Sequence, residues 1–440
     1  MRLRATPGGG DAYVPTSGDD GYDVDRYDLE IDYRVRTNRL VGVATITLVT
    51  TRETSVLAFD LVHLRATAVR VDGHRASFAQ RDPKLRVTLP HEVPAGTHVT
   101  VEVEYGGSPV PRRSRWGRIG WEELADGAIV ASQPTGAPTW FPCNDHPGRK
   151  ARMRIAVTTE KDYHVVATGS PAGQSTRGAL RTWRFLQETP TATYLAAVQV
   201  GRYSTHERQL AGVPVALHHP RALHRRVHHD FAGLEAMLTL FSSSFGPYPL
   251  ERYDVVVTPD VLEIPIEAQG MATFGSNHVD GAGGSERLIA HELAHQWFGN
   301  SVGVASWQHI WLNEGFACYS EWLWSEASGR ESADATARHH HASLLAQPQD
   351  LVLGDPGPAD MFDDRVYKRG ALLVHALRLT LGDETFFGAL RAWTAARRDG
   401  VATTSDLLAH LEAFTGRDLG ALFDDWLVAT ALPPLPTASP

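Results

Sequence analysis

Hydrophobic and polar residues alternate with a period of two through much of the first half of the chain. Runs at residues 27–35, 41–49, 99–105 and 152–160 follow this pattern or are rich in β-branched residues, and Gly, Pro and Asp separate them. This arrangement is typical of short β-strands joined by turns. We therefore predict an antiparallel β domain over residues 24–204. We find no repeat of fixed period that would indicate a solenoid or a propeller.

The pattern changes near residues 203–206. A few more strand-like runs follow, and then apolar residues recur at helical spacing. The helical segments are 285–298, 312–327 and 366–381. We predict a second, mainly helical domain over residues 205–430, which gives an α+β protein with more than one domain. A chain of 440 residues is also longer than one hydrophobic core normally supports.

Both ends of the chain are predicted to be loose tails. Residues 1–23 are rich in Gly, Ser, Pro and Asp, and residues 431–440 are rich in Pro. Such composition is typical of segments without regular structure.

Composition narrows the class of protein. Hydrophobic residues make up 42% of the chain and charged residues 21%, which excludes a mainly disordered protein. The net charge of −9 argues against a general nucleic-acid or anionic-membrane surface, and no apolar stretch is long enough to span a membrane. The chain has only two cysteines, Cys143 and Cys318, which could form at most one disulfide bridge. So few cysteines are more typical of cytosolic proteins than of a disulfide framework. We therefore expect a cytoplasmic protein with neither nucleic acid nor membrane as a partner.

The segment HELAH contains two histidines four residues apart, His291 and His295. In the helix predicted for 285–298, with Ser285 as its N-cap, both rings lie on one face and can bind one zinc ion. Glu292 lies beside them, and its carboxylate can take a proton from a metal-activated water. The segment therefore predicts a site for metal-assisted hydrolysis.

A catalytic zinc ion needs a third protein ligand, for which two histidines and one glutamate are a known set. Glu314 follows His295 in the next predicted helix, and two antiparallel helices would bring it to the metal. Glu321, seven residues later, lies on the same helical face and could orient a zinc ligand. We predict one Zn²⁺ ion held by His291, His295 and Glu314.

The chain contains 21 histidines, which raises the chance of an accidental HExxH motif, but a glutamate at one fixed later spacing lowers that chance. Histidines also occur in the runs 218–220 and 339–342. Consecutive residues on a helix face different directions, so we do not expect these runs to bind a metal.

These motifs resemble a known family. HELAHQWFGN followed by WLNEGFACYSE resembles the gluzincin aminopeptidases, the family of aminopeptidase N and the leukotriene hydrolase, and the likeness covers nearly all of residues 24–425. The resemblance implies a saddle-like N-terminal β domain followed by a thermolysin-like catalytic domain. Family members commonly continue into a large helical domain that covers the active site. We expect a short form without it, with a more open site or one closed by a homo-oligomeric partner.

The resemblance also implies roles for single residues. Glu267, in EIPIEAQGMATF, stands where the family binds the α-amine of the substrate, although four neighbouring residues differ from the family motif. Gln133, in ASQPTG, stands at a second amine-binding position. Tyr367, in VYKRG, stands where a tyrosine donates a hydrogen bond to the oxyanion, and Arg369 replaces the usual lysine.

Together these residues predict a zinc aminopeptidase that acts on peptides with a free N-terminus. A carboxylate at Glu267 would bind the cationic N-terminus and restrict cleavage to the first peptide bond. Two alternatives stay open. A zinc endopeptidase would use the same metal ligands without an amine-binding glutamate, and a non-catalytic scaffold would keep only the fold.

Overall fold

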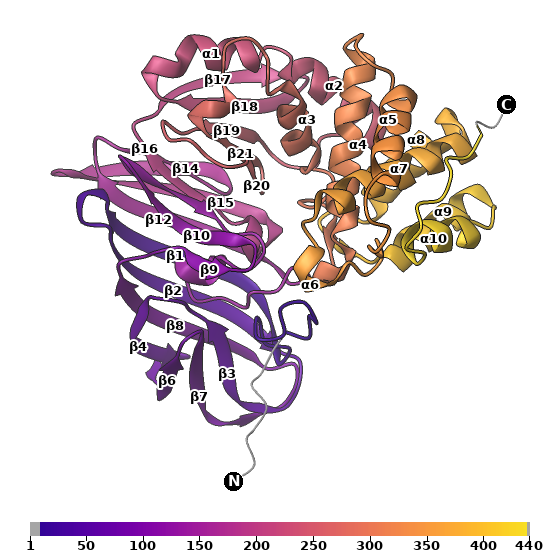
Figure 1. The fold of residues 1–440 in the computed structure, drawn as a ribbon. Coiled ribbons are helices and arrows are strands. Elements are labelled where there is room, and N and C mark those ends of the chain that lie inside the picture. Colours follow the sequence, from indigo (N-terminus) through magenta and orange to yellow (C-terminus); the bar gives the residue numbers. More distant parts are fainter. Residues whose placement is uncertain (1–8, 438–440) are drawn as a thin grey trace. The chain divides into compact units, whose positions relative to one another are not determined.

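The computed structural model describes residues 9–437, which form two compact units (Figure 1). The first unit ends at Ser204 and also contains the short segments His218–Pro220 and Ala268–Met271. The second unit contains the rest of the chain from Thr205 onward. The change predicted near residues 203–206 thus lies next to the end of the first unit.

The first unit is built on a long sheet with the strand order β14-β15-β12-β1-β2-β8-β4-β5. Period-two alternation explains its core: on β1, Tyr27, Leu29, Ile31 and Tyr33 are buried, while the residues between them are not. The strands are β1 (Tyr22–Arg34), β2 (Arg39–Thr50), β4 (Arg65–Val71), β5 (His74–Arg75), β8 (His98–Gly107), β12 (Lys150–Glu160), β14 (Ser170–Arg177) and β15 (Leu180–Ala192).

Two smaller sheets complete the first unit, with the orders β13-β16-β11-β10-β9 and β3-β7-β6. Their strands are β3 (Thr54–Asp60), β6 (Phe78–Arg81), β7 (Lys84–Val93), β9 (Arg112–Ser114), β10 (Gly117–Leu124), β11 (Gly127–Ala131), β13 (His164–Ala167) and β16 (Val198–Gly201). The predicted β-rich domain is confirmed. The expectation of a purely antiparallel domain is wrong in one place, because β1 and β12 pair in parallel.

Residues 9–21 are not the loose tail that their composition predicts. Asp19 is buried: its backbone N–H donates to Oδ1 of Asn144 at 2.9 Å, and its Oδ2 accepts from the N–H of Ala58 at 3.0 Å. The Gly18 N–H donates to Oδ2 of Asp60 at 2.7 Å. This Gly-rich and Asp-rich segment forms turns, and the turns bring its backbone N–H groups and carboxylates within hydrogen-bonding distance of the rest of the unit. Residues 1–8 of the predicted tail lie outside the described residues.

Buried charge also lies in the first unit. Lys84 Nζ and Asp60 Oδ1 are 2.6 Å apart, and their side chains are only 2% and 3% exposed. Asp145 is buried as well, and its Oδ1 accepts a hydrogen bond from Thr193 Oγ1 at 2.7 Å. Burial and the nearby Asp60 raise the pKa of Asp145 to about 7. The carboxyl group of Asp145 is therefore partly protonated near neutral pH.

The second unit combines a sheet, in the order β17-β18-β19-β21-β20, with helices. Its strands are β17 (Ser204–Leu210), β18 (Val213–His219), β19 (Tyr253–Val257), β20 (Ile266–Ala268), β21 (Met271–Phe274), β22 (Gly303–Val304) and β23 (Val401–Ala402). Its helices are α1 (His224–Asp230), α2 (Leu234–Phe245), α3 (Glu286–Ala294), α4 (Trp311–Ala327), α5 (Ala333–Leu345), α6 (Gly357–Asp360), α7 (Asp364–Leu381), α8 (Asp383–Ala396), α9 (Thr404–Thr415) and α10 (Gly420–Leu427).

Two of the predicted helices, 312–327 and 366–381, correspond closely to α4 and α7. The helix predicted for 285–298 begins as expected after Ser285 but ends earlier, at Ala294. After Ala294 the hydrogen bonds tighten to i→i−3, with Trp297 N–H donating to the Ala294 carbonyl, and Gly299 then adopts a positive φ of 114°. The apolar pattern continued through this turn, so the spacing alone overestimated the helix.

Helix α4 packs against both α3 and α7, and all three are labelled in Figure 1. The contact between α4 and α7 depends on two glycines. A Cβ added to Gly315 would lie 2.8 Å from the carbonyl carbon of Gly370, closer than real Cβ atoms approach. The two backbones therefore touch directly, one residue after Glu314 and three residues after Tyr367.

The C-terminal segment is attached to the second unit where it is described. His341 Nε2 lies 2.8 Å from the Pro433 carbonyl oxygen, and the Leu432 N–H donates to Gln349 Oε1 at 2.8 Å. The predicted loose tail of 431–440 is thus held through at least two of its residues, and 438–440 lie outside the described residues.

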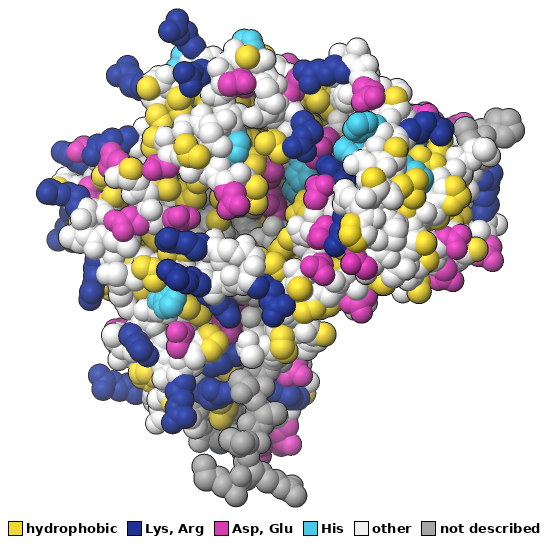
Figure 2. All heavy atoms as spheres, in the orientation of Figure 1, with side chains coloured by type: hydrophobic (Ala, Val, Ile, Leu, Met, Phe, Trp, Pro, Cys, Tyr) yellow, Lys and Arg dark blue, Asp and Glu magenta, His cyan; other side chains and the backbone are white. Residues whose placement is uncertain are grey.

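Surface charge and helix length are relevant to the expectation that neither nucleic acid nor a membrane is a partner. Acidic and basic side chains are interspersed over the face shown in Figure 2. In the part of the chain that the structure describes, no helix combines the length and the apolar character needed to cross a bilayer.

Candidate metal centre

Three side chains of the second unit converge as possible metal ligands. His291 lies in α3, His295 directly follows its last residue, and Glu314 lies in the first turn of α4. The Nε2 atoms of both histidines lie 3.5 Å from Oε2 of Glu314. Ligand atoms bound tetrahedrally at about 2.1 Å from one ion are about 3.4 Å apart, so each histidine nitrogen has the distance from Glu314 expected of two ligands of one ion.

The opposite ring nitrogens are held by acceptors. His291 Nδ1 lies 2.8 Å from Oε1 of Glu321, and Glu321 Oε2 also accepts from Arg287 Nη1 at 2.8 Å. His295 Nδ1 lies 3.0 Å from the carbonyl oxygen of Phe298. Since each acceptor favours a proton on Nδ1, Nε2 of each ring is the atom that faces Glu314 and that a metal ion would bind, in exchange for any proton held there. This donor set fits a divalent metal ion.

Electrostatic effects connect these groups. Burial acts to lower the pKa of His291, but contact with Glu314 and Glu321 raises it to about 10. Burial acts to raise the pKa of Glu314, but His295 and His291 lower it to about 2. Glu314 is therefore ionised at neutral pH and supplies the negative charge that a bound cation requires.

Glu292 has the position expected of a proton acceptor. It follows His291 on α3 and is only 4% exposed. Its Oε2 is buried and has no hydrogen-bond partner among the described residues. Burial raises the pKa of Glu292 to about 7, although His291 and His295 act to lower it. A buried carboxylate oxygen that makes no structural hydrogen bond is available to accept a proton from a bound molecule.

Glu267 and Tyr367 lie near the same group. A carboxylate oxygen of Glu267 lies within 4.8 Å of ligand atoms of Glu292 and His295. Burial raises its pKa, and His295 acts in the opposite direction. The Tyr367 ring stacks on His291 with 6.1 Å between ring centroids. Burial and the carboxylates nearby raise the pKa of Tyr367 well above its usual value, so its hydroxyl stays protonated and can donate.

Both units of the chain match domains of known proteins. Residues 24–195 match the Peptidase M1 N-terminal domain, and residues 230–426 match the Peptidase family M1 domain. The chain belongs to peptidase family M1. The predicted resemblance to metallo-aminopeptidases and the predicted order of a β-rich domain followed by a helical one are therefore confirmed.

Curated M1 relatives are longer than this chain. "Aminopeptidase M1-A" of Oryza sativa subsp. japonica is 31% identical over 68% of this chain and 36% of its own length. "Probable aminopeptidase 2" of Sulfurisphaera tokodaii is 26% identical over 93% of this chain and 54% of its own length. The chain thus spans between about a third and about half of the length of these relatives.

Solved M1 structures include proteins of similar length. The M1 zinc metallopeptidase from Deinococcus radiodurans is 31% identical, with a TM-score of 0.89 over 98% of this chain and 100% of that chain. A mutant form from the same organism, described as bound to a Tyr-Ser-Ala substrate, is 32% identical, with a TM-score of 0.88 over 98% of this chain and 99% of that chain. The two-domain architecture of this chain therefore occurs in a crystallised M1 metallopeptidase.

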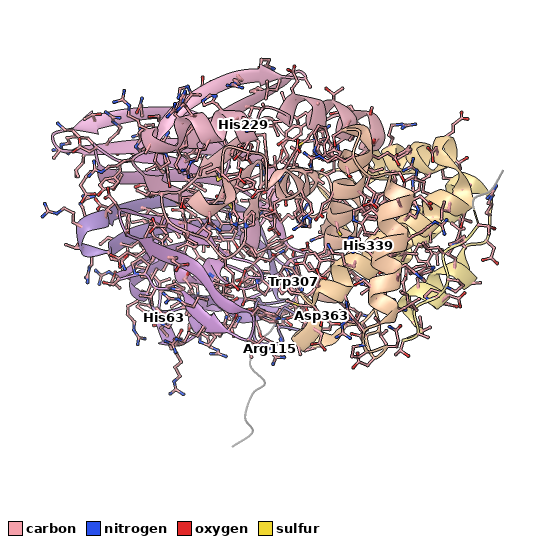
Figure 3. The ribbon with its side chains drawn as sticks, turned by 45° about the horizontal axis from the view of Figure 1, so that its top comes forward. His63, Arg115, His229, Trp307, His339 and Asp363 are labelled. Carbon is pink, nitrogen blue, oxygen red and sulfur yellow. The ribbon has the colours of Figure 1, made fainter. Side chains whose placement is uncertain are left out.

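Other residues considered in the sequence belong to other elements of this M1 chain. Gln133 belongs to the first unit and follows β11; its side-chain nitrogen is buried without a hydrogen-bond partner among the described residues. Its contact with a substrate amine stays a prediction. In the run 339–342, His340 stacks on Trp322 at 5.3 Å, and His339 is labelled on α5 in Figure 3. Among the described residues, no group of possible metal ligands includes His339, His340 or His341.

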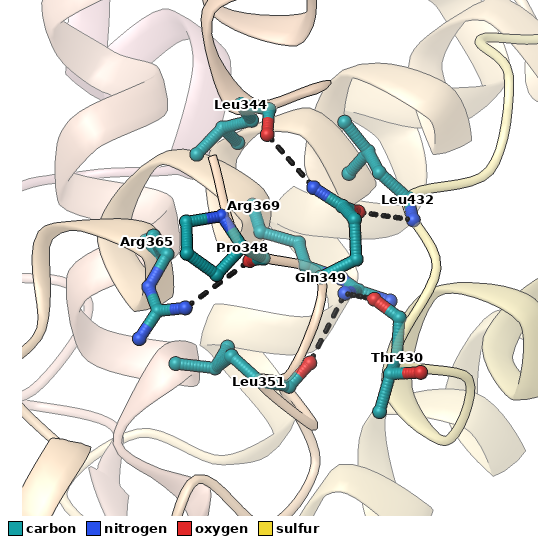
Figure 4. Close-up of a pocket in the computed structure, with 8 residues that line it drawn as sticks. All are labelled: Leu344, Pro348, Gln349, Leu351, Arg365, Arg369, Thr430 and Leu432. Carbon is teal, nitrogen blue, oxygen red and sulfur yellow. Dashed lines mark hydrogen bonds between the residues drawn. The ribbon is translucent and has the colours of Figure 1, made fainter. Parts of the chain in front are cut away.

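Arg369 of this M1 chain holds several segments of the second unit together through hydrogen bonds. Its guanidinium donates to backbone carbonyls on three segments, including those of Leu351 at 3.2 Å, Trp426 at 3.0 Å and Thr430 at 2.7 Å. Several of these groups surround a cavity of about 20 Å³, which has room for about one water molecule (Figure 4). Burial lowers the pKa of Arg369 to about 10, so it stays charged at neutral pH. A lysine there could not span so many carbonyls, because it lacks the planar fork.

Sequence reasoning missed two residues near the metal centre. Arg287 precedes His291 by four positions and pairs with Glu321, a spacing that the helical pattern could have indicated. Tyr253, at the start of β19, lies close enough to Glu292 for that carboxylate to contribute to its raised pKa, after burial as the larger cause. The Tyr253 hydroxyl has no hydrogen-bond partner in the described part of the chain. No local motif marks this tyrosine.

Proposed function

We propose that this M1 chain is a zinc aminopeptidase that releases the N-terminal residue of peptides. The observation that carries the proposal is the convergence of two imidazole nitrogens on one oxygen of Glu314, with an unpaired oxygen of Glu292 nearby. Two histidines and one glutamate are a ligand set of catalytic zinc. The relatives described as a zinc metallopeptidase and as aminopeptidases support the same activity.

The proposed reaction is attack of water on the first peptide carbonyl. Zinc held by His291, His295 and Glu314 supplies a Lewis acid for this chemistry. Glu292 accepts the proton of the attacking water and transfers it to the leaving amine. The Tyr367 hydroxyl donates a hydrogen bond to the oxygen on which negative charge develops.

Glu267 is proposed to select substrates with a free N-terminus. Its carboxylate lies within 4.8 Å of Glu292 and His295 atoms, so an ammonium group bound there would lie close to the proposed general base and metal ligand. Gln133 is proposed as a second ligand of that amine. A peptide bond further along the chain would place its charged terminus away from Glu267, which favours exopeptidase activity.

A panel of aminoacyl fluorogenic substrates tests the proposal. Release of the fluorophore should require metal, stop with a chelator, and be nearly absent in Glu292→Gln but not in the control variant Glu384→Gln, whose side chain is exposed on α8. Matched peptides with free and N-acetylated termini separate the alternatives. Equal cleavage of both would indicate an endopeptidase, and no chelator-sensitive cleavage of any peptide would indicate a scaffold.

The proposal includes the setting in which the enzyme acts. Both cysteines are free and buried, which fits a reducing compartment such as the cytoplasm. A homo-oligomer is proposed as one means of closing the active site. Light scattering of the purified protein tests this, and a monomer with an enclosed site would contradict it.

A further inference from the structure

Three histidines of the second unit form another cluster of side chains with metal-binding chemistry. His206 lies on β17, and His224 and His228 lie on α1. The ring centroids are 4.8 Å apart for His206 and His224, 4.8 Å for His206 and His228, and 4.2 Å for His224 and His228. One side-chain nitrogen from each lies within 4.8 Å of those of the other two. None of these residues belongs to the proposed catalytic centre.

The local fold explains why the rings meet. His224 and His228 are four positions apart, so one turn of α1 places both on the same face. His206 lies on β17, the edge strand of its sheet, and reaches the same point from another part of the chain. The four-residue spacing of His224 and His228 equals that of His291 and His295, whose ring centroids are 4.8 Å apart. Sequence reasoning considered only consecutive histidines and therefore missed this pair. It also did not expect a metal ligand in the run 218–220, whereas His219 of that run belongs to the same group of possible ligands.

The cluster is open to solvent. His224 is exposed, and His206 and His228 are half-buried. An ion can therefore reach the rings without a change in the core. Neutral imidazole is a strong ligand for zinc and its neighbours in the first transition series, and three imidazoles suffice to hold zinc in other proteins.

One neighbour competes with an ion. The Arg208 guanidinium contacts His228 Nδ1, and an arginine can only donate to that nitrogen. If Nδ1 binds the ion, its lone pair is no longer available to Arg208. If Nε2 binds the ion, the ring proton must be on Nδ1, which then cannot accept. Metal binding by His228 and this hydrogen bond exclude each other in both cases.

We propose that His206, His224 and His228 bind a second divalent transition-metal ion, such as Zn²⁺. The ion would connect β17 to α1, two elements that are separated along the chain. Because it binds the folded protein through residues from both elements, it stabilises the second unit. Arg208 reduces the affinity for the ion and has to turn away when it binds.

The test starts with purified protein that contains one equivalent of zinc. Zinc is added and binding is followed by calorimetry, metal analysis and thermal unfolding. The wild type should take up a second equivalent and unfold at a higher temperature. His224→Ala and His206→Gln should lose the second equivalent and keep the first. The matched control is His229→Ala, which removes a neighbouring exposed histidine of α1 that is labelled in Figure 3.

Two further variants complete the test. His295→Ala removes a proposed ligand of the first ion, and this variant should still bind one equivalent at the cluster, so failure of the catalytic assignment and failure of the cluster are separable. Arg208→Ala should bind the second ion more tightly than the wild type. Absence of a second equivalent in the wild type, its persistence in His224→Ala, its loss in His229→Ala, or weaker binding by Arg208→Ala would each overturn the proposal.

Discussion

Replacing Glu321 with glutamine should weaken zinc binding although no metal ligand is removed. One oxygen of Glu321 lies 2.8 Å from His291 Nδ1 and the other lies 2.8 Å from Arg287 Nη1. Glutamine has nearly the same shape, but it lacks the negative charge, and one end of its amide is a donor. His291 then loses a charge-assisted hydrogen bond that orients its ring and increases the basicity of Nε2.

The expected magnitude follows from burial. Losing such a partner of a ligating histidine lowers metal affinity by about 10- to 100-fold, or about 1.4–2.7 kcal/mol. The Glu321 side chain is 3% exposed, so water cannot take its place, and we expect the upper part of this range. Arg287 is 58% exposed, so solvent can hydrate its guanidinium in the variant and the protein should still fold.

Zinc affinity is measured by competition with a chromogenic chelator, and folding is checked by thermal unfolding of the zinc-loaded protein. At saturating zinc, the Glu321→Gln variant should recover most of its activity, because all three ligands are present. Glu384→Gln, an exposed change on α8, should bind zinc like the wild type. An unchanged zinc affinity in Glu321→Gln would refute the reasoning.

Four other changes give measurable outcomes. Gly315→Ala should lower the free energy of unfolding in urea by about 1–3 kcal/mol, because its methyl group meets the α7 backbone, and should lower kcat by displacing Tyr367. Glu292→Gln should retain zinc in metal analysis but lose at least about 100-fold in kcat. Arg369→Lys should lower the free energy of unfolding by about 2 kcal/mol or more, since a lysine cannot reach all the carbonyls. The pKa of Asp145 is about 7 when folded and about 4 when unfolded, so its contribution to stability is complete below pH 4 and is lost as the pH rises to 7. Asp145→Asn should remove that dependence, about 2–4 kcal/mol, from urea unfolding curves at pH 5 and pH 8.

Each of these expectations has an outcome that would contradict it. Wild-type stability in Gly315→Ala would mean that α4 and α7 can separate freely. Zinc loss in Glu292→Gln would assign that residue to the ligands instead of to proton transfer. A stable Arg369→Lys variant would mean that the carbonyls find other donors, and an unchanged pH dependence in Asp145→Asn would assign the dependence to other groups.

The grouping of His291, His295 and Glu314 was predictable because helical spacing is a local property. The four-residue interval between His291 and His295 fixes a common face wherever the helix lies, and Glu314 needed only a second helix packed against the first. The strands of the first unit were predictable for a similar reason, since alternation along β1 or β2 reports which face is buried.

Other features depend on partners that are distant in sequence. The parallel pairing of β1 with β12 joins residues more than a hundred positions apart, and neither strand carries a mark of its direction. The burial of Asp19 depends on Asn144 and Ala58, so its Gly-rich and Asp-rich surroundings appeared to be a tail. Tyr253 comes near Glu292 only through the fold. Local composition reports the intrinsic preference of a segment. It does not report the hydrogen bonds and contacts that the segment makes with distant parts of the folded chain.

The contact between Gly315 and Gly370 limits how the active site can change. Because the two backbones meet without an intervening side chain, the separation of the α4 and α7 backbones beside Glu314 and Tyr367 is set by peptide atoms. A wider separation of the two helices therefore cannot be obtained by shortening side chains at this contact, as none remains to be shortened. If the proposed activity holds, changes in the preference for the N-terminal residue are expected from loops or from β20, while the backbones that carry Glu314 and Tyr367 keep their separation.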